Sequence, residues 1–168
     1  MAGPLSRLNI LVVDDNAQMR TIIGTVLTGV GVGQLHYAQD GWHALQVMHH
    51  TSIDVAYVDH EMPGMSGLDF LSMVRTRETD ERFLPVIMVT GHSEMSRLIE
   101  ARDRGVTEFL RKPVTVGSIL ARLESVILRP RLFVKSASYF GPDRRRRQAS
   151  DYGGPRRRAS DRTVALEL

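Results

Sequence analysis

Five polar residues in this sequence could together bind a cation and a phosphoryl group. They are Asp14, Asp15, Asp59, Thr90 and Lys112. Each comes just after, or ends, a predicted strand, and the first of these, residues 8–13, is an apolar run typical of a strand buried on both faces. In a parallel α/β sheet the carboxyl ends of the strands meet at one edge, where ligands bind. We therefore expect these five side chains, although far apart in the sequence, to lie close together.

The side chains at this edge favour phosphoryl chemistry on a hard cation. Three carboxylates, in a chain without cysteine, suit oxygen-bound Mg²⁺, and Mn²⁺ could replace it. A carboxylate beside such a cation can attack phosphorus, because the cation neutralises the charge that repels the incoming group. We assign that role to Asp59. Thr90 and Lys112 can hold the phosphoryl oxygens as charge spreads onto them.

Each of these residues also has an ordinary structural interpretation when it is taken alone. Asp14-Asp15 could form a turn or a helix cap, and Thr90 could be another cap. A single lysine such as Lys112 is usually a solvated surface charge. All of them follow predicted strands that end at the same edge, and that coincidence favours the functional interpretation.

Apolar spacing predicts the elements that position these residues. Apolar runs predict strands over residues 8–13, 53–58 and 85–89, and residues 34–38 and 107–111 are two further strand candidates. Helical spacing predicts helices over residues 19–27, 41–48, 67–74, 95–99 and 116–127, and Thr115 can cap the last one. This alternation predicts a doubly wound α/β domain with a five-stranded parallel sheet and five helices.

Charge and composition divide the chain into two parts. Residues 1–128 carry 11 Arg and Lys against 15 Asp and Glu, whereas residues 129–168 carry 11 against 4. We therefore expect a domain over residues 1–128 and a basic, Gly/Pro/Arg-rich, disordered tail over residues 129–168. No apolar run approaches the roughly 20 residues that cross a bilayer, and no leader is recognisable, so we expect a cytoplasmic protein.

The motifs resemble those of response regulator receiver domains in two-component systems, including the chemotaxis-type single-domain regulators with a flavodoxin-like fold. The resemblance covers about residues 7–127. It rests on Asp14-Asp15, on Asp59 with Met62-Pro63-Gly64 and Gly67, on Thr90-Gly91 and on Lys112-Pro113. It implies that Asp59 accepts a phosphoryl group from a histidine kinase or phosphotransfer protein. Such a chain is not a conventional enzyme, since it catalyses only its own Mg²⁺-dependent phosphorylation and dephosphorylation.

The resemblance also implies roles for residues around the acceptor. Asp14, Asp15, Asp59 and the main-chain carbonyl of Glu61 would bind the metal, and the Lys112-Pro113 peptide would be cis. Thr90 and Phe109 would form a switch, although Phe109 has no hydroxyl with which to fix its orientations. Glu61 and His92 would tune dephosphorylation. Downstream proteins would bind the face made by the fourth helix, fifth strand and fifth helix.

The arginine runs of the tail leave several interpretations open. They comprise Arg144, Arg145, Arg146, Arg147, Arg156, Arg157 and Arg158. They could merely keep the chain soluble, or could bind nucleic acid, an anionic membrane or an acidic protein, with Tyr139, Phe140 and Tyr152 available to stack. The tail could also fold back onto the acidic domain when Asp59 is unphosphorylated. A Mg²⁺-dependent hydrolase is a further alternative, disfavoured because the acids lack a hydrolase's paired spacing on the first strand.

Overall fold

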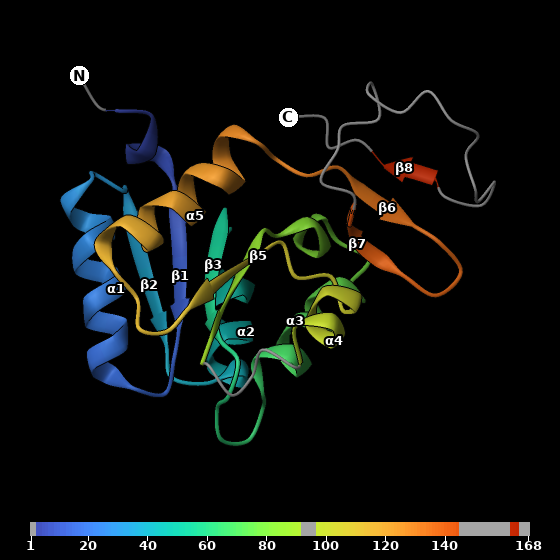
Figure 1. Cartoon of the computed structure of the whole chain (residues 1–168), viewed down its shortest axis with the longest axis horizontal. Helices are drawn as coiled ribbons and strands as arrows, with labels where there is room; N and C mark the ends of the chain where they lie inside the picture. Colours follow the sequence, from blue (N-terminus) through green and yellow to red (C-terminus); the bar gives the residue numbers. More distant parts are fainter. Residues whose placement is uncertain (1–2, 92–96, 145–161, 165–168) are drawn as a thin grey trace.

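A five-stranded parallel sheet forms the centre of the protein (Figure 1) in a computed structural model that describes residues 3–91, 97–144 and 162–164. Its strands are β1 (Asn9–Val13), β2 (Gln34–Ala38), β3 (Val55–Asp59), β4 (Val86–Thr90) and β5 (Glu108–Arg111). Their spatial order is β2-β1-β3-β4-β5, and all pairs are parallel. Every residue of β3 and β4 is buried. The predicted doubly wound fold is confirmed.

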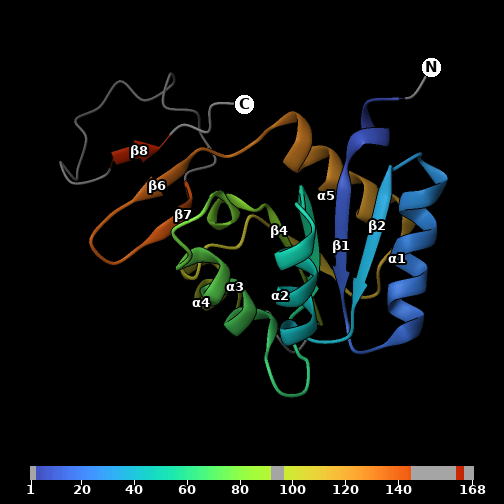
Figure 2. The same cartoon turned by 180° about the vertical axis from the view of Figure 1, so that it is seen from behind.

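Helices cover both faces of the sheet (Figures 1 and 2). One face carries α1 (Ala17–Gly29) and α5 (Val116–Leu128), and the other carries α2 (Gly41–His50), α3 (Gly67–Arg75) and α4 (Leu98–Asp103). The sheet therefore separates two apolar cores. As predicted, the Thr115 side chain caps α5 by accepting a hydrogen bond from the Ser118 amide at 3.1 Å. Met95, expected in the fourth helix, lies outside the described residues.

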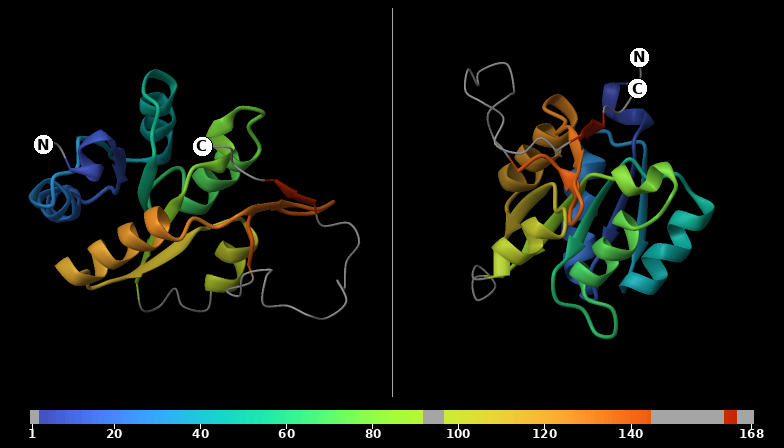
Figure 3. Two further views of the ribbon diagram at one scale, coloured as in Figure 1. Left: turned by 90° about the horizontal axis from the view of Figure 1, so that it is seen from above. Right: turned by 90° about the vertical axis from the view of Figure 1, so that its right-hand side faces the viewer.

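Order extends past residue 128, where the sequence predicted a disordered tail. The strands β6 (Phe133–Lys135), β7 (Phe140–Pro142) and β8 (Arg162–Val164) form a second sheet, antiparallel, in the order β7-β6-β8. Figure 3 shows the hairpin of β6 and β7 extending from the chain that leaves α5. The expected disorder therefore does not hold for residues 133–142. The remaining tail residues of the prediction, 145–161 and 165–168, lie outside the described part.

Aromatic side chains dock this hairpin on the main domain. Phe133 is 3% exposed, and its ring centroid lies 5.2 Å from that of Phe83, the last residue of η2 (Asp80–Phe83). The ring of Phe140 lies 5.5 Å from the same Phe83 ring. Phe140 and Tyr139 were expected to be available to a partner, but Phe140 is half-buried against Phe83 and the Tyr139 hydroxyl donates to the Pro142 carbonyl.

The buried ring of Phe133 should contribute strongly to stability. Replacing a buried phenylalanine with alanine removes apolar contacts and leaves a cavity, which costs about 3 kcal/mol or more. We expect Phe133→Ala to lower the free energy of unfolding by that amount in urea denaturation. The neighbouring Leu132 is 52% exposed, so Leu132→Ala should change it by less than about 0.5 kcal/mol. Equal effects of the two substitutions would show that the hairpin is not docked.

Candidate functional site

Three carboxylates meet at the carboxyl edge of the central strands. Asp14 and Asp15 directly follow β1, and Asp59 is the last residue of β3. Because β1 and β3 are parallel neighbours, their ends place one oxygen from each carboxylate within 4.8 Å of the others. Asp14 and Asp59 are 1% and 3% exposed, whereas Asp15 is exposed. The structure thus forms the acidic pocket that the sequence predicted, and such a pocket could bind a metal ion.

The Asp14 carboxylate has one oxygen engaged and one unsatisfied. The Asn16 amide donates to Oδ1 at 2.8 Å, while Oδ2 is buried and accepts no hydrogen bond from the described residues. A buried oxygen without a partner is costly unless an ion or water satisfies it. The unsatisfied atom therefore fits a cation ligand.

Lys112 and Thr90 complete the site from the two strands on the other side. The Lys112 ammonium donates to Asp59 Oδ1 at 2.7 Å, and the peptide between Lys112 and Pro113 is cis, as expected. The Lys112 amide also donates to the Thr90 carbonyl at 2.7 Å. Thr90 is 2% exposed at the end of β4. Four strands therefore bring together all five residues that the sequence singled out.

Local packing positions the Asp59 end of β3. Gly67 begins α3 against this strand, where a Cβ atom would clash with the Asp59 carbonyl oxygen. The Gly67 amide donates to the His60 carbonyl at 3.0 Å, which closes the loop between β3 and α3. The glycine that the sequence singled out at this position thus permits a close approach of two backbones.

The electrostatics of the pocket oppose ionisation of its acids. The pKa of Asp59 is raised to about 6, mainly by burial and also by the neighbouring Asp14 and Asp15 carboxylates, while Lys112 acts in the opposite direction. Burial also raises the pKa of Asp14. Carboxylates that are held together at this cost are typical of functional sites, where a cation or a reacting group compensates for the repulsion.

The other residues with predicted roles around Asp59 differ in burial, and one of them lies outside the described residues. Glu61 is exposed, and its carboxylate lies 3.5 Å from the guanidinium of Arg97. Phe109 on β5 is partly buried against the core that contains α2 and α3. The metal, tuning and switch roles of these residues stay predictions. His92 lies outside the described residues.

Among the arginines of the predicted anion-binding tail, the structure describes only Arg144. Its guanidinium lies 3.0 Å from an Asp103 oxygen and 3.9 Å from the centre of the Tyr139 ring. Arg144 is thus engaged within the chain. The other six lie outside the described residues, at positions 145–147 and 156–158, so binding of nucleic acid or another anionic surface stays a prediction.

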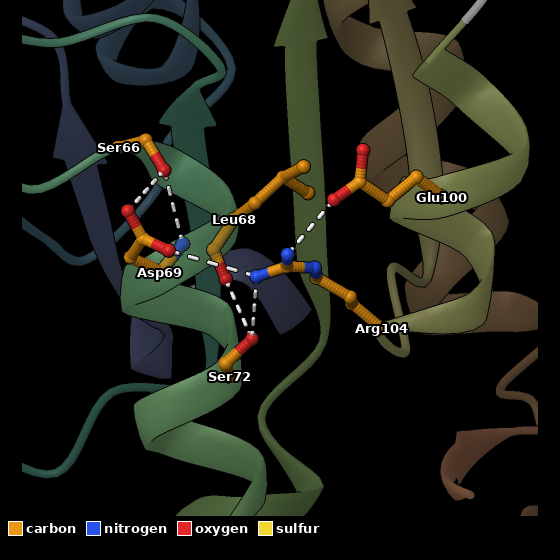
Figure 4. A network of polar contacts seen from close by, with 6 residues as sticks. All are labelled: Ser66, Leu68, Asp69, Ser72, Glu100 and Arg104. Atoms are coloured by element: carbon orange, nitrogen blue, oxygen red, sulfur yellow. Dashed lines mark hydrogen bonds and ion pairs between the residues drawn. The ribbon is translucent and has the colours of Figure 1, made fainter.

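A polar network around Arg104 joins α3 and α4, and none of its members is among the predicted site residues. Arg104, the residue after α4, donates to Glu100 at 2.8 Å and to Ser72 of α3 at 3.3 Å. Its guanidinium also lies 3.6 Å from Asp69, which accepts a hydrogen bond from Ser66, the cap of α3 (Figure 4). The i,i+4 spacing of Glu100 and Arg104 was a visible signal. The contacts to α3 are long-range and had no signal in the spacing.

Comparison with known proteins identifies the main domain. The family model of the response regulator receiver domain matches residues 10–124. Chemotaxis protein CheY of Pseudomonas aeruginosa is 38% identical over 124 residues, which cover 73% of this chain and 98% of that protein. The DNA-binding transcriptional regulator NtrC of Escherichia coli K12 is 31% identical over 116 residues, covering 69% of this chain but only 24% of NtrC.

Structural comparison agrees with the sequence matches. The chemotaxis response regulator CheY4 of Vibrio cholerae superimposes with a TM-score of 0.66 at 29% identity, covering 71% of this chain and 98% of that one. The family match ends at residue 124. The antiparallel sheet of β6, β7 and β8 therefore lies beyond the matched residues. Among the described helices, none is long and apolar enough to cross a membrane.

Proposed function

This chain belongs to the response regulator receiver family, and on that premise we propose that Asp59 accepts a phosphoryl group from a histidine kinase or phosphotransfer protein. Family membership does not by itself identify the residue or the reaction, and the proposal names both. The observation that carries it is the position of Asp59, with Lys112 hydrogen-bonded to one oxygen and the unsatisfied Asp14 Oδ2 in the same pocket. A nucleophile, a cationic group and a metal ligand thus lie together.

The proposed transfer makes one bond and breaks one. A carboxylate oxygen of Asp59 forms a bond to phosphorus, and the bond from phosphorus to the donor's imidazole nitrogen breaks. The electron pair of that bond stays on the imidazole. Lys112, already 2.7 Å from the carboxylate, and the Thr90 hydroxyl would hold the phosphoryl oxygens as their charge develops.

Mg²⁺ is the cation that best suits this pocket, and Mn²⁺ could replace it. Asp14, Asp15, Asp59 and the main-chain carbonyl of Glu61 would hold it with oxygen ligands, which hard cations prefer. When bound, the ion would neutralise the repulsion between the pocket and the incoming phosphoryl group.

Mg²⁺ binding should weaken in acid. A carboxylate must be deprotonated to bind the ion, and the pKa of Asp59 is raised to about 6. As the pH falls below that value, protons compete for Asp59, so we expect the affinity at pH 5 to be about tenfold lower than at pH 7. Isothermal titration calorimetry would measure it. Asp59→Asn should bind more weakly at both pH values, with a smaller difference between them. Equal affinities of the unmodified protein at pH 5 and pH 7 would contradict the proposed ligand set.

The proposed output is a change in protein contacts. Membership of the receiver family supports signalling by protein contact through the face of α4, β5 and α5. The chain would then not be a conventional enzyme, since its catalysis is limited to its own phosphorylation and dephosphorylation. A cytoplasmic location stays a prediction from the sequence. The match to receiver domains disfavours the alternative of a Mg²⁺-dependent hydrolase.

The chemistry can be tested with a small donor that has a phosphorus–nitrogen bond. We expect phosphoramidate with Mg²⁺ to phosphorylate the protein and neutral hydroxylamine to release the group, because a phosphorylated aspartate is an acyl phosphate. The hydroxamate left behind should map to Asp59 by peptide mass spectrometry. A phosphoryl group that resists hydroxylamine, or a hydroxamate at another residue, would refute the proposal.

A further inference from the structure

The short helix α4 lies between the site and the C-terminal hairpin. Just before it, Arg97 pairs with Glu61, which lies two residues after Asp59. Asp103, its last residue, pairs with Arg144 at the end of the hairpin. A helix of this length spans about 9 Å. A movement at its amino end is therefore transmitted directly to its carboxyl end.

Polar contacts hold α4 against α3 in the present arrangement. The Arg104 guanidinium bonds to Glu100 of α4 and also contacts Asp69 and Ser72 of α3, so it links the two helices (Figure 4). Asp69 is in turn bonded to Ser66, the residue that caps α3 where the Asp59 loop ends. These ionic groups are partly exposed, and exposed ion pairs contribute little individually. Ala101 is the one residue of α4 that is buried in the apolar core, so a small change in the position of α4 would disturb little apolar packing.

The hairpin contacts the chain at the carboxyl end of α4 very closely. Gly141 of β7 lies against Gly105, so that a Cβ atom on Gly141 would come within 2.8 Å of the Gly105 Cα. The Gly105 carbonyl also accepts two hydrogen bonds from Arg75, at 3.1 and 2.9 Å. The Arg75 guanidinium lies under the hairpin, 5.0 Å from the centre of the Phe133 ring. A shift of the residues that follow α4 would therefore disturb the docking surface.

The surface on which the hairpin docks contains a buried cation, Arg75, whose hydrogen-bond partners are uncharged. Arg75 is buried, and within the described part of the chain its hydrogen bonds go to the neutral carbonyls of Gly105 and Arg82. Burial lowers the pKa of its guanidinium to about 9, so it keeps its charge at neutral pH. A buried cation with neutral partners is stabilised only while those partners stay in place. Gly105, which supplies one of these carbonyls, also contacts Gly141 of the hairpin, so the docking of the hairpin depends on the position of Gly105.

We propose that phosphorylation of Asp59 weakens the docking of the hairpin, residues 131–144, through α4. The added negative charge beside Glu61 competes for Arg97 and draws the amino end of α4 toward the site. The contacts at the other end, Asp103 with Arg144 and Gly105 with Gly141, then loosen. The inference rests on the proposed function, and makes the hairpin the part of this chain that reports phosphorylation.

Hydrogen exchange measured with and without phosphorylation tests this coupling. The full chain is incubated with Mg²⁺, with or without acetyl phosphate, intact mass gives the phosphorylated fraction, and exchange is followed in peptides from 131–144. A two-stranded hairpin without a partner surface is marginally stable. We expect exchange there to rise at least about fivefold on phosphorylation, a typical allosteric coupling. Phosphorylation with unchanged exchange overturns this inference alone, whereas absence of phosphorylation overturns the proposed function and this inference with it.

Variants of the hairpin separate coupling from general loosening. Gly141→Val should undock the hairpin, because the added side chain would collide with the Gly105 backbone and with the Tyr139 side chain, giving fast exchange that phosphorylation does not raise further. Arg144→Gln should raise exchange before phosphorylation and reduce the increase that follows it. Arg129→Gln, at an exposed position, should behave like the unmodified protein. An equal phosphorylation-dependent increase in all three variants would place the response outside the α4 contacts and overturn the inference.

Discussion

Asp59→Asn is expected to abolish phosphorylation by small phosphodonors and by a kinase alike. An amide has the same shape as a carboxylate but is a very poor nucleophile, so no bond to phosphorus forms. The signal in a gel assay that retards phosphoproteins should fall to background. The folded structure should persist, because the substitution removes a buried carboxylate whose pKa is raised to about 6, a sign that its ionised form is unfavourable there.

The same strand provides a matched control. Asp54 precedes β3 at the opposite edge of the sheet, where its Oδ2 accepts a hydrogen bond from the Asn9 amide at 2.7 Å. An asparagine can still accept that bond. Asp54→Asn should therefore be phosphorylated like the unmodified protein, and an equal loss in both variants would assign the effect to folding.

Lys112→Ala is expected to have the second-largest effect. Lys112 is the cationic group bonded to the Asp59 carboxylate. From this position its ammonium can stabilise the negative charge that develops on the phosphoryl oxygens during transfer. Removing one such preorganised donor typically slows a reaction about 10²- to 10³-fold. The rate of phosphorylation by acetyl phosphate, followed by mass spectrometry over time, should fall by that factor.

The chain has one other lysine for comparison. Lys135 is exposed on β6, away from the carboxyl edge of the main sheet, and Lys135→Ala should leave the phosphorylation rate unchanged. A rate for Lys112→Ala within about threefold of the unmodified protein would exclude electrostatic stabilisation by Lys112, since even one lost donor should cost more than that.

The central fold and the site were predictable because both depend on strong local signals. Apolar runs of five or six residues favour strands buried on both faces when segments with helical spacing alternate with them. Once the strands are parallel, the residues after their ends must share an edge. Asp14, Asp59 and Lys112 therefore came together as expected, although 98 positions separate the first from the last.

The docked hairpin could not be predicted from the same signals. β6 and β7 have three residues each, too few for an alternating pattern to stand out. Its docking surface uses Arg75 and Arg82 stacked on aromatic rings, and arginines in a sequence normally indicate solvated positions. The pairing of Phe133 with Phe83 also joins residues fifty positions apart. Tertiary packing, which has no local pattern, decides this part of the structure.

Intact-mass spectrometry of the unmodified chain after incubation with acetyl phosphate and Mg²⁺ tests the central claim most directly. The account predicts the addition of a single phosphoryl group that is absent when the metal is chelated and absent from Asp59→Asn. No addition under any condition, or the same addition in Asp59→Asn, would contradict the claim that this pocket is a phosphoryl acceptor.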